Sequence, residues 1–333
     1  MKTLASEVRL RLLGQSELSV SPLGLGCWQF SRGSGIVGRY WSNLSDADIL
    51  EIVRVSLEGG MNWVDTAEIY GGGKSEQALA HVLDQLAQEG SPHAAPLIAT
   101  KWWPMLRTAG SITATIDERI AALGGRDIDL YQIHQPFSLS SIASEMKAMA
   151  GLVQAGKIRY VGVSNYSAKQ MTEAHRLLGT YGLSLVSNQV KYNLLDRRID
   201  RNGTMAAAKE LGISIIAYSP LEQGILTGRF HHDPSQVAAV SRSRRLMSGL
   251  DDKSLARSRP LIASLTALAD KYEATPGQVA LNWLIHYHGD TVVAIPGASK
   301  ARHARENVGA MTFRLQPEEL ELLNEASWAA LKK

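Results

Sequence analysis

The sequence of 333 residues has a single cysteine, Cys27, which excludes an internal disulfide and any metal site built from several cysteines. It has no uninterrupted run of the roughly 18–20 apolar residues that a membrane-spanning helix needs. Its first residues, MKTLASEVRLRLL, include no apolar run of the length typical of a secretory signal. From these absences we expect a cytoplasmic protein with no membrane partner, and we assign no metal ligands.

The sequence also lacks a strong excess of charge of either sign. Lys plus Arg number 35 and Asp plus Glu 32, and the net charge of +3 is too small to indicate a nucleic-acid partner. Hydrophobic residues make up 45% of the chain and charged residues 20%, which is typical of a soluble globular protein with a large core. No Pro-, Gly- or Ser-rich linker divides the chain, so we expect a single domain over residues 1–333.

Short apolar segments alternate with amphipathic ones along the chain. The apolar segments have the length and composition of β-strands, and they are 23–28, 61–66, 96–101, 128–134, 159–165, 185–190, 213–219 and 291–297. Helical spacing of apolar residues is found in 46–58, 75–86, 111–123, 141–155, 168–178, 203–211 and 259–272. Eight strand–helix units in one undivided chain predict an α/β fold of the (β/α)8 TIM-barrel type. A doubly wound sheet is the alternative, but LGLGCWQF lacks the third glycine of a phosphate fingerprint and no helical pattern follows it.

Two segments lie outside this alternation. Residues 8–20 alternate around Gly14, Gln15 and Ser16, which predicts an N-terminal β-hairpin placed to plug the N-terminal end of the barrel. Residues 220–258 form a long loop after the seventh strand, longer than a plain connection requires. Seven basic and three acidic residues lie between 225 and 259. This basic loop suits three roles: contact with a cofactor pyrophosphate, contact with an acidic partner, or a segment that is disordered without ligand.

Four titratable residues lie at or just after the ends of three consecutive predicted strands. Asp65 ends the second strand with Tyr70 five residues on, Lys101 ends the third, and His134 ends the fourth. Each alone has an ordinary explanation, such as a solvated lysine or a helix-capping aspartate. Because the carboxyl ends of TIM-barrel strands meet at one rim, we expect the four side chains to lie together.

These four residue types suit the protonation of a carbonyl oxygen. A tyrosine hydroxyl has a pKa of about 10, and a nearby ammonium lowers that pKa. We therefore expect Lys101 to make Tyr70 a better acid, Asp65 to hold Lys101 charged, and His134 to hydrogen-bond the substrate oxygen. Hydride for the carbonyl carbon must come from a cofactor, because no side chain supplies it.

Seven motifs in the same order resemble the aldo-keto reductase family, and the likeness extends from the hairpin to about residue 310. They are WVDTAEIYG, IATK, IHQP, GVSN, NQVKYN, AYSPL and IPGASKARHARENVGA. The resemblance implies a (β/α)8 barrel that reduces aldehydes or ketones to alcohols with NADPH. It also implies that Asp65, Tyr70, Lys101 and His134 are the catalytic residues, with Tyr70 as the general acid.

The same resemblance implies the cofactor-binding residues. Ser164, Asn165 and Gln189 correspond to those that bind the nicotinamide carboxamide, and Tyr218 to the ring that stacks on the nicotinamide. The pyrophosphate loop corresponds to Ser219, Leu221, Gly224, Leu226 and Gly228, and the adenine contacts to Glu306 and Asn307. His303 stands where many relatives have an arginine against the 2′-phosphate. Ser299, Lys300, Arg302 and Arg305 are close enough in sequence to compensate, so we expect NADPH, with NADH as a weaker alternative.

Aromatic residues follow several of the predicted strands and indicate an apolar or planar substrate. Among them we assign Trp28, Trp41 and Trp102 to the substrate pocket, and we expect only one of Trp102 and Trp103 to face it. Arg32 and Arg39 leave an anionic substrate open.

The catalytic residues favour an enzyme acting on a small-molecule carbonyl compound. The chain also resembles the potassium-channel β subunits, so an NADP(H)-binding regulatory or sensor subunit with slow turnover is the alternative. A homo-oligomer is possible, and no interface pattern decides it.

Overall fold

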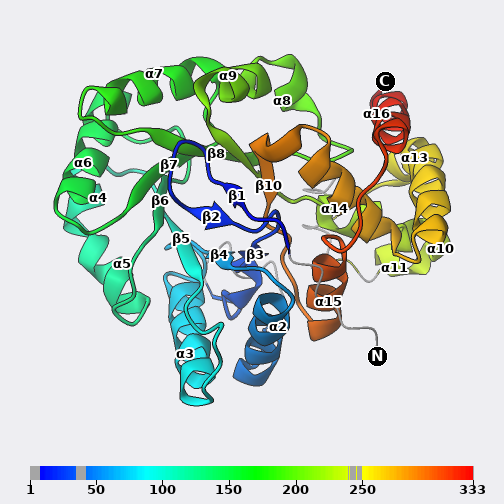
Figure 1. The fold of residues 1–333 in the computed structure, drawn as a ribbon, viewed down its shortest axis with the longest axis horizontal. Helices are drawn as coiled ribbons and strands as arrows, with labels where there is room; N and C mark the ends of the chain where they lie inside the picture. Colours follow the sequence, from blue (N-terminus) through cyan, green and yellow to red (C-terminus); the bar gives the residue numbers. More distant parts are fainter. Residues whose placement is uncertain (1–7, 35–42, 239, 241–244, 246–249, 333) are drawn as a thin grey trace.

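The computed structural model describes residues 8–34, 43–238, 240, 245 and 250–332. Eight parallel strands form one sheet in the order in which they occur in the sequence (Figure 1). They are β3 (Leu25–Gly26), β4 (Trp63–Asp65), β5 (Leu97–Trp102), β6 (Leu130–Ile133), β7 (Tyr160–Ser164), β8 (Leu185–Lys191), β9 (Ser214–Tyr218) and β10 (Val292–Ala294). Parallel bridges between Leu23 and Ala294 and between Gly26 and Gly297 join the two edge strands and close the barrel. Each predicted strand coincides with one of these, β5 and β8 each ending one residue later than predicted, and the TIM-barrel prediction is confirmed.

The predicted N-terminal hairpin is present and covers the N-terminal end of the barrel (Figure 1). It consists of β1 (Arg11–Leu12) and β2 (Ser19–Val20), which pair antiparallel. Leu13, Leu18 and Val20 are buried against the residues that fill the barrel interior, among them Trp63, Val186 and Val293. Gly14 has a φ of 57°, and a Cβ there would lie 2.2 Å from the Val186 carbonyl oxygen, so only glycine fits this close approach.

Helices surround the barrel, and five of the predicted ones are found within a few residues of the expected bounds: α2 (Asp46–Glu58), α3 (Lys74–Gln88), α6 (Ile142–Gln154), α7 (Ala168–Gly179) and α9 (Thr204–Leu211). Ser45 caps α2 as predicted, its hydroxyl accepting from the Asp48 N–H. Gly212 ends α9 with a φ of 64°. Local capping residues therefore set these helix ends.

Other helices differ from the prediction. The expected helix 111–123 is two helices, α4 (Gly110–Ala114) and α5 (Ile116–Ala122), because Thr115 leaves the helical conformation between them. The expected helix 259–272 is α13 (Asp252–Lys271), which begins earlier because Asp251 caps it through the Ser254 N–H. The segment expected to be a long loop contains η2 (Glu222–Thr227), α10 (Arg229–His232) and α11 (Ser235–Ala238).

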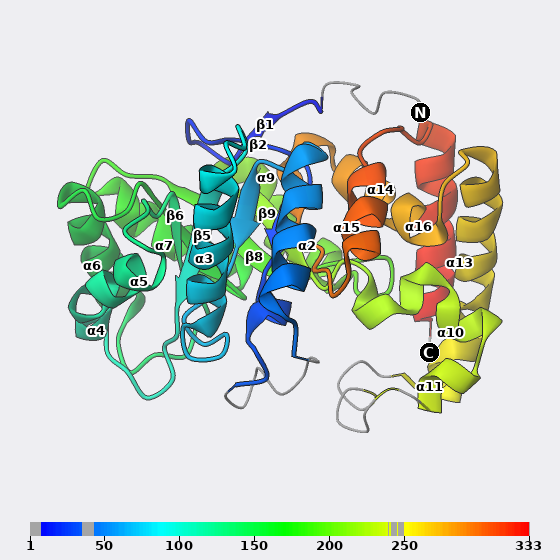
Figure 2. The ribbon, with the colours of Figure 1, turned by 90° about the horizontal axis from the view of Figure 1, so that it is seen from below.

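The remaining elements were not predicted. They are η1 (Trp28–Phe30), α8 (Arg198–Arg201), α14 (Pro276–His286), η3 (Gly289–Thr291), α15 (Ala301–Gly309) and α16 (Pro317–Leu331). Figure 2 shows α13, α14, α15 and α16 gathered on one side of the barrel, with the loops that follow the strands at the lower end of that view. Among the described residues, no helix is both long and apolar enough to cross a membrane.

Candidate active site

Asp65 and Lys101 form an ion pair at the carboxyl ends of β4 and β5. Their side chains are 1% and 0% exposed. The other Asp65 oxygen accepts hydrogen bonds from the amides of Gln132 (3.1 Å) and Gln189 (2.8 Å), and Lys101 also donates to the Thr66 carbonyl oxygen at 2.8 Å. A buried ion pair needs such additional partners to offset its loss of hydration. The pair is therefore a fully bonded unit inside the barrel.

Tyr70 lies in the turn after β4, and the Lys101 Nζ is 5.1 Å from the centroid of its ring. Burial raises the pKa of the Tyr70 hydroxyl above its ordinary value, and the Lys101 ammonium opposes that rise without cancelling it. Lys101 thus lowers the pKa of Tyr70 as expected, but the pKa stays above its usual value because desolvation of the phenolate is the larger effect. Burial alone would lower the pKa of Lys101, but the neighbouring Asp65 carboxylate and Tyr70 together outweigh it, so the pKa is raised.

His134 follows β6 and faces Tyr70. The two ring centroids are 5.7 Å apart with an interplanar angle of 81°. Burial, together with the Lys101 charge, lowers the pKa of His134 well below its usual value. Its buried Nδ1 has no hydrogen-bond partner among the described residues. His134 is therefore a neutral imidazole with an open ring nitrogen.

A cavity of about 540 Å³ opens above these residues. Predicted site residues make up half of its lining, and they come from the ends of seven strands and from α15: Trp28, Asp65, Tyr70, His134, Ser164, Asn165, Gln189, Tyr218, Ser219, Leu221, Gly224, Ser299, Glu306 and Asn307. Lys101 lies beneath Tyr70, where no solvent reaches it. The structure thus brings together the four predicted catalytic residues and ten of the predicted cofactor residues.

Other predicted residues lie elsewhere. Leu226 is buried in the core, and Gly228 forms the left-handed turn that ends η2. Lys300 and Arg302, at the start of α15, do not line the cavity. Arg305 points away and pairs with Glu51 of α2 at 3.0 Å. The cavity side of α15 is therefore the side of His303, Glu306 and Asn307.

The assignment of Trp102 to the substrate pocket is wrong. Trp102 is fully buried, and its Nε1 donates to the Ser111 hydroxyl at 3.1 Å. Trp103 lines the cavity instead and contacts the His134 ring edge-on, with centroids 5.2 Å apart. Successive side chains of a strand point to opposite faces, so Lys101 and Trp103 share one direction and Trp102 takes the other. Trp41 lies outside the described residues.

Two arginines were considered as contacts for an anionic substrate, and the structure shows where one of them, Arg32, points. Arg32 forms an ion pair with Asp46 at the start of α2. Arg39 lies outside the described residues. Arg32 is therefore held toward the helix, and its charge is shared with a carboxylate.

Sequence reasoning missed several residues that line the cavity: Gln29, Gln135, Gln223 and Arg229. Arg229 is the most informative, because its buried Nε has no partner among the described residues. Burial, and then the charge of Arg302, lowers the pKa of its guanidinium. Its position directly after the Gly-Ile-Leu-Thr-Gly segment was the signal that could have revealed it.

Strained backbone gathers at this cavity. Seven described residues other than glycine have a positive φ, and three of them, Asn165 (61°), Ser219 (51°) and Gln223 (54°), line it. Such conformations cost about 1–3 kcal/mol each and persist where the surrounding structure imposes them. The Tyr218 hydroxyl donates to the Asn165 side chain at 3.1 Å and helps hold this arrangement.

The family follows from comparison with known proteins. The sequence matches the Aldo/keto reductase family over residues 22–327. The chain belongs to this family. Aldo/keto reductases are oxidoreductases that bind nicotinamide cofactors, and this chain is therefore an oxidoreductase.

Relatives of this aldo/keto reductase come from plants and bacteria. The chloroplastic pyridoxal reductase of Arabidopsis thaliana is 32% identical over 314 residues, covering 91% of this chain and 82% of the relative. An uncharacterized oxidoreductase of Mycobacterium tuberculosis is 37% identical over 317 residues, covering 93% of this chain and 90% of the relative.

Solved structures of aldo/keto reductases share the fold. A thermostable aldo-keto reductase crystallised with the inhibitor epalrestat superposes with a TM-score of 0.74 at 28% identity, covering 95% of this chain and 99% of the other. A putative 2,5-diketo-D-gluconic acid reductase B has a TM-score of 0.68 at 25% identity, covering 92% and 88%.

Proposed function

We propose that this chain reduces aldehydes or ketones to alcohols with NADPH, and that Tyr70 is the general acid. The observation that carries the proposal is the buried chain of contacts from Asp65 through Lys101 to the Tyr70 hydroxyl, which meets a neutral His134 at the floor of the cavity. A proton donor, a cation behind it and a neutral hydrogen-bonding ring are the groups that the protonation of a carbonyl oxygen requires.

In the proposed reaction, Tyr70 donates its hydroxyl proton to the carbonyl oxygen. The Lys101 ammonium beside the Tyr70 ring stabilises the tyrosinate that remains. Asp65 keeps Lys101 protonated and correctly oriented. His134 is neutral, so its ring N–H orients the carbonyl oxygen without adding a second positive charge. Because the pKa of Tyr70 lies above its usual value of about 10, the hydroxyl keeps its proton throughout the neutral range.

The cavity residues fit a nicotinamide cofactor. Ser164, Asn165 and Gln189 present hydroxyl and amide groups beside Tyr218, which suits a carboxamide held against an aromatic ring. Arg229, with its unpartnered Nε, suits a pyrophosphate oxygen. NADPH, when bound, supplies the hydride that reduces the carbonyl carbon.

The 2′-phosphate of NADPH fits the basic end of the cavity. His303 lines it, and its pKa is lowered by burial and by the charges of Arg302, Arg229 and Lys300. All three positive charges act on the His303 ring, so these basic groups lie near it and near one another. We therefore propose NADPH as the preferred cofactor and NADH as a weaker one.

The test is NADPH oxidation, followed by absorbance, with aliphatic, aromatic and sugar aldehydes. Pyridoxal belongs in the panel, because a 32% identical relative is named pyridoxal reductase. We expect Tyr70→Phe to lower kcat/KM by at least about 100-fold while the Kd for NADPH stays nearly unchanged. Tyr181→Phe, at an exposed tyrosine, is the matched control.

Retained turnover in Tyr70→Phe would remove Tyr70 from the role of general acid. Tight NADPH binding with negligible turnover of every carbonyl would favour the alternative, an NADP(H)-binding regulatory subunit.

A further inference from the structure

Exposed apolar side chains gather on the two loops that carry the cavity residues Trp103 and His134. Among the described residues, eight large apolar side chains are exposed, and four of them lie on the two loops that follow β5 and β6: Met105 (51%), Leu106 (82%), Phe137 (46%) and Leu139 (65%). We call these four residues the apolar shelf. The other four, Leu10, Leu12, Tyr181 and Leu322, lie on the hairpin, after α7 and on α16. Exposed apolar side chains clustered in this way mark binding surfaces more often than scattered ones do.

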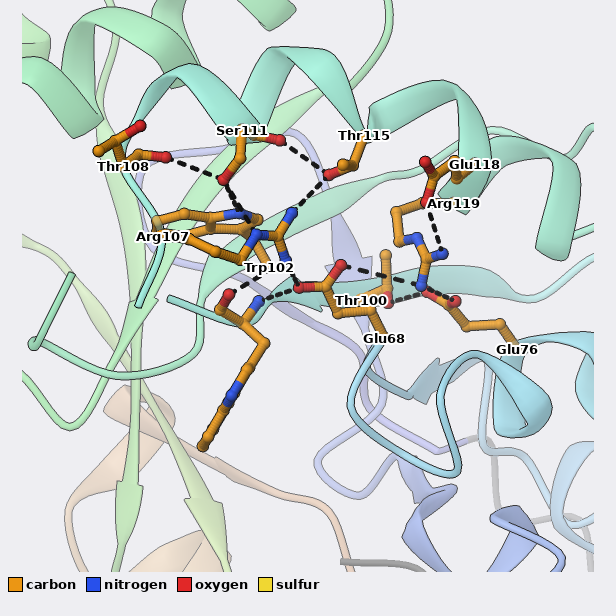
Figure 3. A network of polar contacts seen from close by, with 11 residues as sticks. Glu68, Glu76, Thr100, Trp102, Arg107, Thr108, Ser111, Thr115, Glu118 and Arg119 are labelled. Carbon is orange, nitrogen blue, oxygen red and sulfur yellow. Dashed lines mark hydrogen bonds and ion pairs between the residues drawn. The ribbon is translucent and has the colours of Figure 1, made fainter. Parts of the chain in front are cut away.

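The two loops that carry the apolar shelf are hydrogen-bonded to each other. The Leu139 N–H donates to the Arg107 carbonyl oxygen at 2.9 Å, and the Ala109 N–H donates to the Ser140 hydroxyl at 2.9 Å. The Arg107 guanidinium holds its own loop through the Trp103 carbonyl oxygen (3.1 Å) and through the hydroxyls of Ser111 and Thr115 (Figure 3). These hydrogen bonds hold the two loops in place and give the apolar shelf a defined shape.

A carboxylate network joins the loop of Arg107 to the loop of Tyr70. Glu68 lies two residues before Tyr70 and accepts hydrogen bonds from the Trp103 N–H and, at 2.5 Å, from Arg107 (Figure 3). Arg119 lies 3.9 Å from Glu68 and 3.0 Å from Glu76. The loops that follow β4, β5 and β6 thus form one connected unit, with the shelf on its outer surface.

The shelf continues the apolar wall of the cavity. The rings of Phe137 and Trp103 meet edge-on with centroids 5.7 Å apart, and Trp103 meets His134 in the same way at 5.2 Å. Aromatic surface is therefore unbroken from the catalytic histidine to the exposed Phe137. Leu106 has a φ of 57°, a conformation that strains a bulky residue, and it holds that side chain in solvent.

We propose that the apolar shelf binds the non-reacting hydrocarbon part of the substrate, so that the chain prefers carbonyl compounds with an extended apolar chain. This inference rests on the proposed carbonyl reduction at Tyr70. The continuity of the shelf with Trp103 and His134 indicates that the substrate itself occupies it. A substrate whose carbonyl group contacts His134 would extend over Trp103 to Phe137. The shelf residues carry no charge, which suits a hydrocarbon and not a sugar or a dianion.

The experiment measures kcat/KM for unbranched aldehydes from butanal to decanal with saturating NADPH. In the wild type we expect a rise of about two- to fourfold per methylene, the range from half to full burial of a CH₂ group. The double variant Phe137→Asn/Leu139→Asn should lower the decanal-to-butanal ratio by about tenfold, corresponding to the loss of one to two methylenes of contact. Leu322→Asn, at an equally exposed leucine on α16, should keep the wild-type ratio.

Leu106→Asn is a second variant that spares the fold, because asparagine tolerates a positive φ better than leucine. It should lower the same ratio by about twofold, the effect of half-burying one CH₂ group. Calorimetric affinities for decan-1-ol and butan-1-ol give the corresponding ratio for binding, which does not depend on turnover. If no aldehyde is reduced but decan-1-ol binding depends on the shelf residues, the proposed carbonyl reduction is wrong, while the inference that the shelf binds a hydrocarbon chain is supported.

Two results would overturn the inference. One is turnover or binding that does not change with chain length, or that changes equally in the shelf variants and in the wild type. The other is a wild type that sediments as a dimer and becomes monomeric in the shelf variants with an unchanged ratio. That result would make the shelf an interface between two copies of the chain.

Discussion

Glu68 accepts a hydrogen bond from the backbone N–H of Trp103, and so ties the loop that carries Tyr70 to the residue that packs on His134. The Glu68 side chain is only 10% exposed and also pairs with Arg107 at 2.5 Å. One carboxylate therefore sets the relative positions of the proposed proton donor and the aromatic wall, although it does not itself line the cavity.

We expect Glu68→Ala to lower kcat for aldehyde reduction by about 10- to 100-fold through misplacement of Tyr70. Glu68→Gln keeps an acceptor for the Trp103 N–H and should recover most of that loss. A merely structural role would be shown by equal loss in both variants, or by loss of thermal stability with no change in kcat of the folded fraction.

Glu76 makes the stability of the fold depend on pH. Burial raises the pKa of its carboxyl from 4.5 to about 7, against the opposing effect of Arg119. The folded chain therefore takes up a proton that the unfolded chain does not yet hold, and the stability from this group is full below pH 4.5 and lost as the pH rises through about 7. The size of the effect is about 3 kcal/mol.

The measurement is urea unfolding of the wild type and Glu76→Gln between about pH 4.5 and pH 8, the range set by the two pKa values. We expect the free energy of unfolding of the variant minus that of the wild type to be largest at the alkaline end of this range. This difference should become smaller by about 3 kcal/mol toward the acid end. A difference that does not change with pH would contradict the raised pKa.

The two adjacent tryptophans should separate stability from activity. Trp102 is fully buried, so Trp102→Ala should lower the free energy of unfolding by about 3–5 kcal/mol. Trp103→Ala should leave a stable fold and change KM for aromatic aldehydes by about tenfold or more, since it removes the ring beside His134. Reversed effects would show that Trp102 faces the substrate.

The basic end of the cavity should distinguish NADPH from NADH. We expect Lys300→Ala and Arg302→Ala each to raise the Kd for NADPH by about tenfold, the effect of losing a charged partner of a phosphate, and to change the Kd for NADH little. Arg305→Ala is the matched control, because that side chain lies on the same helix but pairs with Glu51. Added salt should reduce the difference between the two cofactors. Equal losses for both would place the 2′-phosphate elsewhere.

Much of the fold could be predicted because the strands of a barrel are buried on both faces and appear as short apolar segments. Helices with one buried face, such as α2 and α7, could be predicted because their apolar residues recur at helical spacing. The helix α14 could not, because eight of its eleven residues are buried and no polar stripe marks its period.

The catalytic residues could also be predicted, since Asp65, Lys101 and His134 directly end or follow strands whose carboxyl ends must meet. Tyr70 was placed with them by its short distance in sequence from Asp65. Arg229 and Glu68 could not be predicted with the same reasoning. Arg229 begins the short helix α10, in a segment where neither a strand nor a helix was predicted, and the role of Glu68 depends on a backbone N–H of another loop.

The sequence by itself determined the barrel, its hairpin plug and the group of four titratable residues at its mouth, because strand periodicity and chain order suffice for these. Only the tertiary structure decided that Trp103 and not Trp102 faces the cavity, and that Arg305 turns toward Glu51. It also decided that burial outweighs the Lys101 charge in setting the pKa of Tyr70. Side-chain direction depends on a one-residue register, and the electrostatic balance depends on how much water is excluded, and neither can be read from the order of residues.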